Sequence, residues 1–439
     1  MGEGGAGWEV TTWQITIGTR RCAPVSCGAG YRHIQECPCS LGGCARVLLA
    51  MKRLGIYVQV PFCQTKCTYC NFHTGVVSSA RFAPYVSGVC YEIEKHRDFY
   101  AAGGVHLPAS FLDVSVDTVY IGGGTPSLLD PAHLQRITDA IRGSFATDLD
   151  EVTLEADPET VSVEKAAGWI AAGINRVSFG VQSFSDEELK ATGRMHRRAD
   201  VYRAAPILRA AGIVNISFDL IAGLPGQTAE SWQRSLEGLT ELSPEHVSVY
   251  LLEVDEASRL GSEVLRGGLR YGAGAIPGDD EMAEFYETAC SLLGAAGYQH
   301  YEISNWGKPG FTSRHNLKYW RREAYLGFGA GAHSFSGTER WANAHDAAEY
   351  VAAIGARRLP IEQHEVLTWE GALEEELFLG LRQLEGIDLG RIEREYGVAV
   401  GSRFDRLMRA GLVEREGSLV RLAPDKLSVS NEVFVELMQ

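Results

Sequence analysis

The sequence predicts an α/β protein: a partial (βα)6 barrel of the TIM type, followed by a C-terminal, mostly helical, winged-helix-like domain. Three observations support this fold class. Strand-like apolar runs alternate with helical patterns from residue 55 to about residue 252, which is typical of a parallel sheet. A glycine-rich stretch then ends the alternation. The end of the chain has the pattern of three helices and a hairpin.

Six runs rich in β-branched and aromatic residues define the predicted barrel. They are Gly55–Val60, Val116–Ile121, Glu151–Glu155, Arg176–Val181, Asn215–Ile221 and His246–Leu252. Helical patterns lie between them, at Pro131–Arg142, Val163–Ala172, Ala199–Ala211 and Ala229–Leu242. Crossovers between parallel strands are right-handed, so such a sheet curls towards a barrel whose strand carboxyl ends share one face. We therefore expect the functional residues just after each strand.

Beyond the barrel, a helical pattern at Asp280–Ala296 leads into a smaller unit. This unit ends with helical patterns at Glu370–Leu384, Leu389–Glu395 and Val400–Ala410, and with a hairpin at Leu412–Leu422. Winged helices often bind nucleic acid, but this one carries many acidic residues and no basic stripe. A structural or partner-docking role fits that composition better.

The predicted domain boundaries lie at residues 50 and 290. Residues 1–50 are rich in Gly and Cys and lack periodicity, so we interpret them as an unstructured extension, or as residues ahead of a true start at Met51. A targeting segment and a second metal site at Cys37-Pro38-Cys39 stay open as alternatives, although the acidic residues suit a transit peptide poorly. Residues 51–290 form the predicted barrel, and residues 291–439 the C-terminal domain.

The composition excludes several classes of protein. The chain has 439 residues, 45% of them hydrophobic, and a formal net charge of −15, so it offers no basic field to attract nucleic acid. No apolar run approaches the roughly 20 residues that span a bilayer, and we expect no transmembrane segment. Ten cysteines without a signal peptide favour metal ligation in a reduced compartment over disulfides. We expect a cytoplasmic protein.

Three cysteines follow the first strand directly. Cys63, Cys67 and Cys70 have the spacing C-x3-C-x2-C, and soft thiolates on one loop suit an iron–sulfur cluster. A cubane needs four ligands, so three cysteines leave one iron open to a small bidentate ligand. A zinc site and unconnected core thiols are the alternatives, but zinc sites usually pair C-x2-C motifs and need a fourth protein ligand. This spacing is characteristic of radical-SAM proteins.

Glycines end the second strand, in Gly122-Gly123-Gly124-Thr125-Pro126. Without Cβ atoms, the backbone of Gly123 and Gly124 can approach a ligand closely. Alone, the run would indicate only a tight turn. One strand after the cysteine loop, it indicates part of a cofactor site, in which the same face holds the ammonium group of a sulfonium cofactor.

Polar side chains lie on or after the next three strands. Glu155 closes the third strand, Gln182 closes the fourth and Asp219 lies on the fifth. Their oxygens and amide groups suit ribose hydroxyls and a methionyl amine, although each alone is more often a solvated or capping residue. Arg194 offers a forked donor for a carboxylate, and its alternative is an ordinary surface arginine.

Together, these motifs resemble the HemN/HemW family of radical-SAM proteins, which contains oxygen-independent coproporphyrinogen III dehydrogenases and related heme chaperones. The resemblance runs from about residue 51 to the end of the chain. It implies a [4Fe-4S] cluster on Cys63, Cys67 and Cys70. It also implies S-adenosyl-L-methionine contacts from Tyr57, Gly123, Gly124, Thr125, Glu155, Gln182, Arg194 and Asp219.

Three features resemble the chaperone branch more than the dehydrogenases. Asn71-Phe72 follows Cys70, where the dehydrogenases carry a further cysteine two places on. The residues before Tyr57 lack the amphipathic helix of the dehydrogenases. Arg314–Trp320 matches the H-N-x-x-Y-W motif associated with heme binding, in which imidazole is an iron ligand and aromatic rings pack on porphyrin.

The resemblance therefore implies that His315 ligates heme, and the alternative for this residue is a hydrogen-bonded histidine in an aromatic cluster. His333, in a glycine-rich segment, is a second possible ligand that we rank below His315. We predict a heme chaperone whose partners are heme and heme-accepting proteins, membrane-bound respiratory proteins among them. The alternative function is coproporphyrinogen III dehydrogenation by a radical-SAM mechanism, which we do not expect.

Overall fold

The structure is a computed structural model that describes residues 10–11, 14–15, 53–108, 111 and 114–438. Its contacts divide the chain into two units, Met1–Leu49 and Ala50–Gln439. In the first unit, strands β1 (Val10–Thr11) and β2 (Gln14–Ile15) pair antiparallel. Met51 and the cysteines of the predicted N-terminal extension lie outside the described residues, and so do the two alternatives for that segment.

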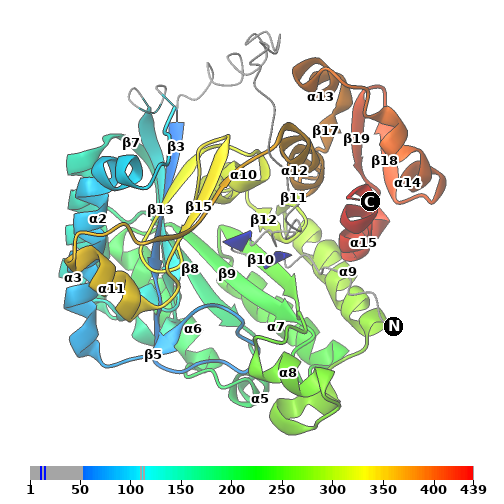
Figure 1. Cartoon of the computed structure of the whole chain (residues 1–439). Helices are drawn as coiled ribbons and strands as arrows, with labels where there is room; N and C mark the ends of the chain where they lie inside the picture. The colour runs from blue at the N-terminus through cyan, green and yellow to red at the C-terminus, as the bar shows by residue number, and fades with distance from the viewer. Residues whose placement is uncertain (1–9, 12–13, 16–52, 109–110, 112–113, 439) are drawn as a thin grey trace, which may run out of the picture. The chain divides into compact units, whose positions relative to one another are not determined.

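All six predicted barrel strands form, and they lie side by side in one sheet (Figure 1). They are β3 (Arg53–Val60), β6 (Ser115–Gly123), β7 (Ala146–Ala156), β8 (Arg176–Gln182), β9 (Asn215–Ala222) and β10 (His246–Leu251). Each pairs in parallel with the next along this series. The predicted α/β fold class is confirmed, and the carboxyl ends of these strands share one edge, as the prediction requires.

Helices connect these strands, and the four predicted ones form with bounds close to those predicted. They are α2 (Phe82–Ala102), α3 (Pro131–Ser144), α4 (Val163–Ala171), α5 (Asp186–Ala191), α6 (Arg198–Ala211) and α7 (Ala229–Leu242). Side-chain caps start several of them: Asp130, Ser162 and Thr228 each accept a backbone N–H of the first turn, as helix starts require. The sequence did not reveal α2, because its buried face includes the polar residues Glu92 and His96.

Residues beyond 252 add strands to both edges of the same sheet. At one edge, β12 (Asn305–Gly307) pairs antiparallel with β10 and with β11 (Gln299–Glu302). At the other edge, β13 (Tyr325–Phe328) pairs in parallel with β3. Strands β14 (His333–Phe335), β15 (Glu339–Asn343) and β16 (Ile361–Val366) follow it in antiparallel order. The sheet is thus built from strands on both sides of residue 290.

Helices α8 (Arg259–Leu265), α9 (Asp279–Ala295), α10 (Arg314–Trp320) and α11 (Ala347–Gly355) accompany these strands. The C-terminal part has α12 (Trp369–Leu381), α13 (Leu389–Tyr396), α14 (Asp405–Arg409) and α15 (Ser430–Leu437) around a small sheet of order β17-β19-β18. Its strands are β17 (Ile387–Asp388), β18 (Val413–Glu416) and β19 (Leu419–Leu422). The predicted helices and hairpin are confirmed.

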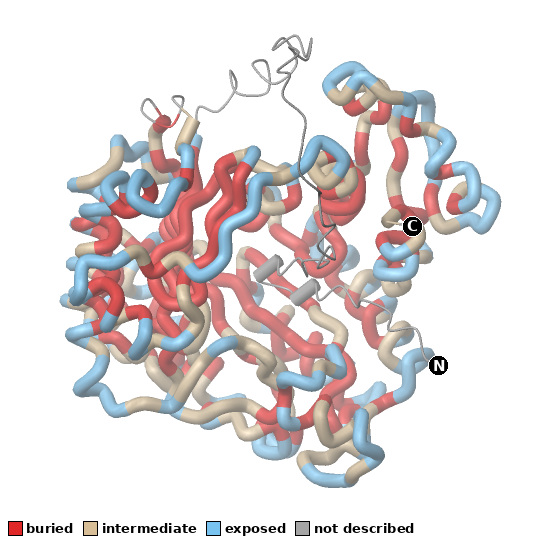
Figure 2. Tube along the Cα trace, in the orientation of Figure 1, coloured by how far each residue is buried: buried red, intermediate tan, exposed pale blue. Residues whose placement is uncertain are grey.

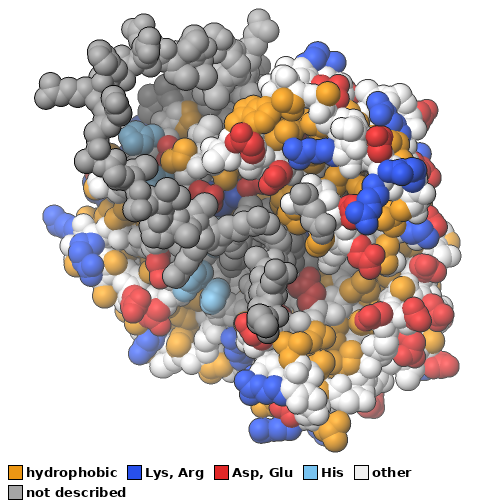
Figure 3. Space-filling view, turned by 45° about the vertical axis from the view of Figure 1, so that its right-hand side comes forward, with side chains coloured by type: hydrophobic (Ala, Val, Ile, Leu, Met, Phe, Trp, Pro, Cys, Tyr) orange, Lys and Arg blue, Asp and Glu red, His pale blue; other side chains and the backbone are white. Residues whose placement is uncertain are grey.

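The core lies along the sheet, where buried strands are flanked by helices with exposed outer faces (Figure 2). Seven of the eight residues of β3 are buried, so both faces of this central strand are covered, as parallel sheets require. Acidic and basic side chains are mixed on the face in Figure 3. Among the described residues, no helix is long and apolar enough to cross a membrane.

Candidate metal and cofactor centre

The cysteine loop is held at the carboxyl end of β3. Strand β4 (Phe62–Cys63) pairs in parallel with β5 (Gly75–Val76), which closes the loop between them. Inside the loop, the Thr68 N–H donates to the Thr192 carbonyl at 3.0 Å, and the Leu260 N–H donates to the Thr68 carbonyl at 2.8 Å. These bonds fix the loop to the segments around α5 and α8, so the three thiols are held in place by the fold.

The three cysteines are partly buried. Cys67 Sγ accepts a hydrogen bond from Arg194 at 3.7 Å, and Cys70 Sγ lies 3.9 Å from Thr74 Oγ1. Burial raises the pKa of the Cys63 thiol to about 11, and it also raises the pKa of Cys70. Such thiols stay protonated until a metal displaces the proton. This donor set suits a metal group better than free nucleophilic thiolates.

The number of thiols in the loop bears on whether it would hold a cluster or a single ion. Among the described residues, no group of three or more His, Cys, Asp or Glu side chains is arranged around one metal position. A zinc site needs four converging ligands, whereas a cubane cluster takes each thiolate on a different iron. Three thiols on one loop are fewer protein ligands than a zinc site needs, and they suit a cubane with one open iron.

The glycine turn after β6 packs directly on the cysteine loop. The Gly124 and Thr125 N–H groups donate to the Val60 and Phe62 carbonyls at 2.8 and 2.7 Å. A Cβ on Gly124 would lie 2.5 Å from the Phe62 carbonyl oxygen, and Gly123 has a φ of +113°. Glycine is needed at both positions for these reasons. In the structure, it is the backbone of the cysteine loop that approaches these glycines closely. The sequence predicted the close approach of a ligand at the same place.

Glu155 joins this turn at the carboxyl end of β7. Its carboxylate accepts from the Gly123 N–H at 2.8 Å and from the Tyr120 hydroxyl at 3.0 Å. Burial raises the pKa of Glu155 to about 7, against the effect of these two donors. A buried carboxylate with a pKa near neutrality is typical of functional sites, and a nearby cation would lower it again.

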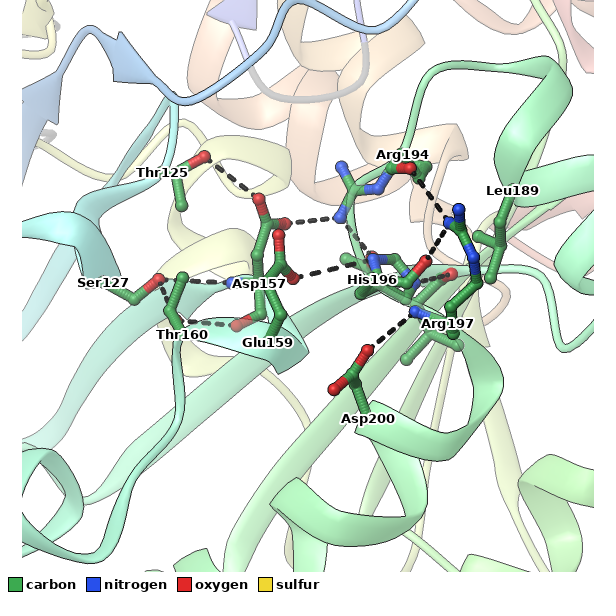
Figure 4. A network of polar contacts seen from close by, with 12 residues as sticks. Thr125, Ser127, Asp157, Glu159, Thr160, Leu189, Arg194, His196, Arg197 and Asp200 are labelled. Carbon is green, nitrogen blue, oxygen red and sulfur yellow. Dashed lines mark hydrogen bonds and ion pairs between the residues drawn. The ribbon is translucent and has the colours of Figure 1, made fainter.

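Arg194 connects the cysteine loop to β7 and β8 (Figure 4). It forms an ion pair with Asp157, and it donates to the Gly180 carbonyl at 2.7 Å. Asp157 also accepts from Thr125 Oγ1 at 3.2 Å. The side chain of Arg194 is 11% exposed, so the alternative of a surface arginine is wrong.

Sequence reasoning missed Asp157 as a functional residue, although it lies in the quoted Glu155-Ala156-Asp157-Pro158 motif. It also missed a second contact in this network, in which His196 Nδ1 lies 3.8 Å from Glu159 Oε2. His196 is buried, and burial lowers its pKa to about 4. Two residues after Arg194, the ring accordingly stays neutral and holds the Val181 carbonyl at 3.0 Å.

The remaining predicted contacts lie on the same strands. Gln182, at the end of β8, has a φ of +63°, and its buried Oε1 has no hydrogen-bond partner among the described residues. Asp219 lies inside β9 and accepts from Ser178 Oγ at 3.1 Å; burial raises its pKa. Tyr57 lies on β3, its ring 6.1 Å from that of Tyr120. Most of the predicted residues thus gather at the strand ends, whereas Tyr57 and Asp219 lie within their strands.

His315 occupies a different place. It lies on α10, fully buried, with Nδ1 2.9 Å from Thr118 Oγ1 and Nε2 2.9 Å from the Tyr319 hydroxyl. The Arg314 and His315 N–H groups donate to Glu151 on β7. Thr118 and Glu151 precede the carboxyl ends of β6 and β7, so His315 is away from the cysteine loop. Both of its ring nitrogens have partners, and burial lowers its pKa to about 3.

Comparisons with known proteins agree with this geometry. The family model of the Radical SAM superfamily matches residues 57–239, and that of the HemN C-terminal domain matches residues 367–425. The curated heme chaperone HemW of Bacillus subtilis (strain 168) is 35% identical over 384 residues, which are 86% of this chain and 97% of that protein. The chain belongs to the HemW family of radical-SAM proteins.

Other HemW-family relatives support this conclusion. The heme chaperone HemW of Mycobacterium tuberculosis (strain ATCC 25618 / H37Rv) is 36% identical over 83% of this chain and 89% of that protein. Among solved structures, the radical SAM enzyme coproporphyrinogen III oxidase (HemN) of Escherichia coli has a TM-score of 0.74. It is 20% identical and covers 89% of this chain and 92% of its own, so this likeness concerns the fold.

Proposed function

We propose that this HemW-family chain is a heme chaperone that binds heme and delivers it to acceptor proteins. We propose also that it carries a [4Fe-4S] cluster with S-adenosyl-L-methionine beside it. The observation that carries the proposal is the match to a named heme chaperone over 97% of that relative's length. The three partly buried cysteines at the carboxyl end of β3 support it.

Cys63, Cys67 and Cys70 would hold the cluster, and a fourth iron would stay open for the amino and carboxylate groups of S-adenosyl-L-methionine. The bound pair would supply one-electron chemistry on the sulfonium group. The protein surroundings suit a cationic ligand, because Glu155 is a buried carboxylate without a cationic partner in its described contacts. The partnerless Oε1 of Gln182 offers a further acceptor.

Arg194, one of the predicted cofactor contacts, would also orient the cluster loop. Its guanidinium stabilises a thiolate on Cys67 through a charge-assisted hydrogen bond. The ion pair with Asp157 keeps the guanidinium in place. The proposed cofactor contacts around this centre are Tyr57, Gly123, Gly124, Thr125, Glu155, Gln182, Arg194 and Asp219.

Heme binding by His315, the ligand that the family motif implies, would require a change in the described conformation. One ring nitrogen would have to leave its partner, Thr118 or Tyr319, whereas the other could keep its hydrogen bond. The motif residues as they stand also have a packing role, since Trp320 stacks on Arg382 at 4.4 Å. His315 remains the heme ligand that the motif predicts.

The test uses the full chain, purified anaerobically and reconstituted with iron and sulfide. We expect hemin to bind at about one per chain, followed by transfer to a heme-free acceptor protein. We also expect no conversion of coproporphyrinogen III to protoporphyrinogen IX under reducing conditions with S-adenosyl-L-methionine. Turnover of coproporphyrinogen III, or a wild-type protein that does not bind hemin, would overturn the proposal.

A further inference from the structure

Three histidines gather beside the cysteine loop. His73 is three residues after Cys70, His333 lies on β14, and His345 follows β15. The ring centres of His73 and His345 are 4.2 Å apart, and those of His333 and His345 are 6.5 Å apart. We call these residues the histidine trio. His73 is far in the sequence from His333 and His345, so the fold brings it beside them.

The trio has ring nitrogens without partners. His333 Nε2 and His345 Nδ1 are both buried, and neither has a hydrogen-bond partner among the described residues. His333 is only 9% exposed. Buried polar atoms are nearly always hydrogen-bonded, so these two nitrogens in neighbouring rings are candidates for ligation. His315 differs, because both of its nitrogens are bonded.

The trio is also open to a ligand and ready to bind a metal. His73 is exposed and His345 half-buried, so the three rings extend from the core to the surface. Burial lowers the pKa of His333 to about 4, and His345, Arg340 and His73 add to this effect. Burial, His345 and Lys66 lower the pKa of His73, against Glu362. Neutral imidazole is the form that ligates iron.

The arrangement favours heme iron over a free metal ion. Among the described residues, no three His, Cys, Asp or Glu side chains surround one metal position, so the trio is not a closed zinc site. Heme iron already has four porphyrin nitrogens and needs only one or two axial ligands. One accessible imidazole with a free nitrogen is therefore sufficient.

We propose that the histidine trio supplies the axial imidazole for heme iron in this protein. The inference rests on the proposed heme-chaperone function and deepens it by naming the binding site. Binding forms an Fe–N bond and releases a water from the iron, with no electron transferred. The heme would lie beside the cluster loop, because Thr74, next to His73, lies 3.9 Å from Cys70 Sγ.

The test is a hemin titration of the full chain, read by Soret absorption and by electron paramagnetic resonance of the ferric iron. The double variant His73→Ala/His345→Ala should lose hemin affinity by at least about tenfold and change the spin state of the iron. Added imidazole should restore the wild-type spectrum. Metal-free protoporphyrin IX should bind the wild type and the double variant equally, because it makes no axial bond.

His333→Leu gives a second measurement, made after thermal unfolding shows that the variant folds, since His333 is buried. His106→Ala is the matched control, because the side chain of His106 is 85% exposed. The trio would not be the heme ligand if hemin affinity and spectra were unchanged in the double variant and in His333→Leu. Loss of hemin ligation in His315→Ala alone would also overturn this assignment. Neither outcome would contradict the chaperone function. A wild type that binds no hemin would overturn both.

Discussion

Arg194 donates a hydrogen bond to the sulfur of Cys67 at 3.7 Å and forms an ion pair with the carboxylate of Asp157. A single guanidinium thus links the loop after β3 to the end of β7. The link is nearly buried, and a charged pair is weakly screened in such a place. It holds Cys67, a proposed cluster ligand, so it offers a way to perturb the proposed centre without removing a cysteine.

Replacing Arg194 by Lys should weaken the cluster without abolishing it. Lysine keeps the charge, but it lacks the fork that reaches Cys67, Asp157 and the Gly180 carbonyl together. We expect a changed reduction potential and faster loss of iron in air, measured by redox titration and iron content. Arg142→Lys on α3 is the control, because Arg142 contacts Asp139 and Thr138 of its own helix. Equal potentials and rates in both variants would contradict this role.

Replacing Cys63, Cys67 or Cys70 by Ala should abolish the cluster. Wild-type protein should contain about four irons and four sulfides per chain after reconstitution, and each variant should contain far fewer. Cys90 on α2 and Cys290 on α9 serve as controls within the described residues. Cys22, Cys37 and Cys39 are expected to be dispensable as well. Wild-type iron and sulfide contents in Cys67→Ala would be incompatible with the loop as the cluster site.

S-adenosyl-L-methionine affinity should rise with pH through about pH 7. The pKa of Glu155 is about 7 without ligand, and the ionised carboxylate is the form that attracts the cationic cofactor. Glu155→Gln should lower affinity by about tenfold and flatten this pH profile, as measured by equilibrium binding to reconstituted protein.

Glu92→Gln is the matched control for this prediction. Burial also raises the pKa of Glu92 to about 7, but its partners are Tyr350, Asn343 and the Gly329 N–H. A carboxyl group whose pKa is higher in the folded protein than in the unfolded chain binds more protons in the folded state, at pH values between these two pKa values. The stability of the protein therefore falls as the pH rises from the pKa of an unfolded-chain glutamate towards 7. Both variants should flatten that fall, and only Glu155→Gln should affect cofactor binding.

Replacing His315 by Ala should destabilise the barrel. The change leaves Thr118 and the Tyr319 hydroxyl without their buried partner and opens a cavity, which together cost about 2–4 kcal/mol. Urea unfolding monitored by circular dichroism measures this loss. A stability equal to that of the wild type would show that His315 is not packed as described.

A chain that begins at Met51 should fold and bind cluster, cofactor and heme like the full chain. The contacts separate Met1–Leu49 from Ala50–Gln439, and β3 begins only at Arg53. Iron content, cofactor binding and the hemin titration should match those of the full chain. Loss of the cluster in the shortened chain would show that the N-terminal residues contribute to the centre.

The sequence predicted what local chemistry determines. Strands such as β9 and helices such as α7 were predicted to within a residue or two, because β-branched runs, amphipathic spacing and caps act over short distances. The position of the cysteine loop at the carboxyl end of β3 follows from its place directly after that strand. The general rule for barrels then placed Glu155 and Gln182 at the same edge.

Only the tertiary structure decided which distant residues meet. Asp157 and Cys67 lie 37 and 127 residues from Arg194, and no periodicity connects them. The pairing of β13 with β3, the burial of His315 against Thr118, and the histidine trio likewise depend on how the chain returns across the sheet. Sequence patterns report neighbours along one element, whereas these contacts depend on the packing of whole elements.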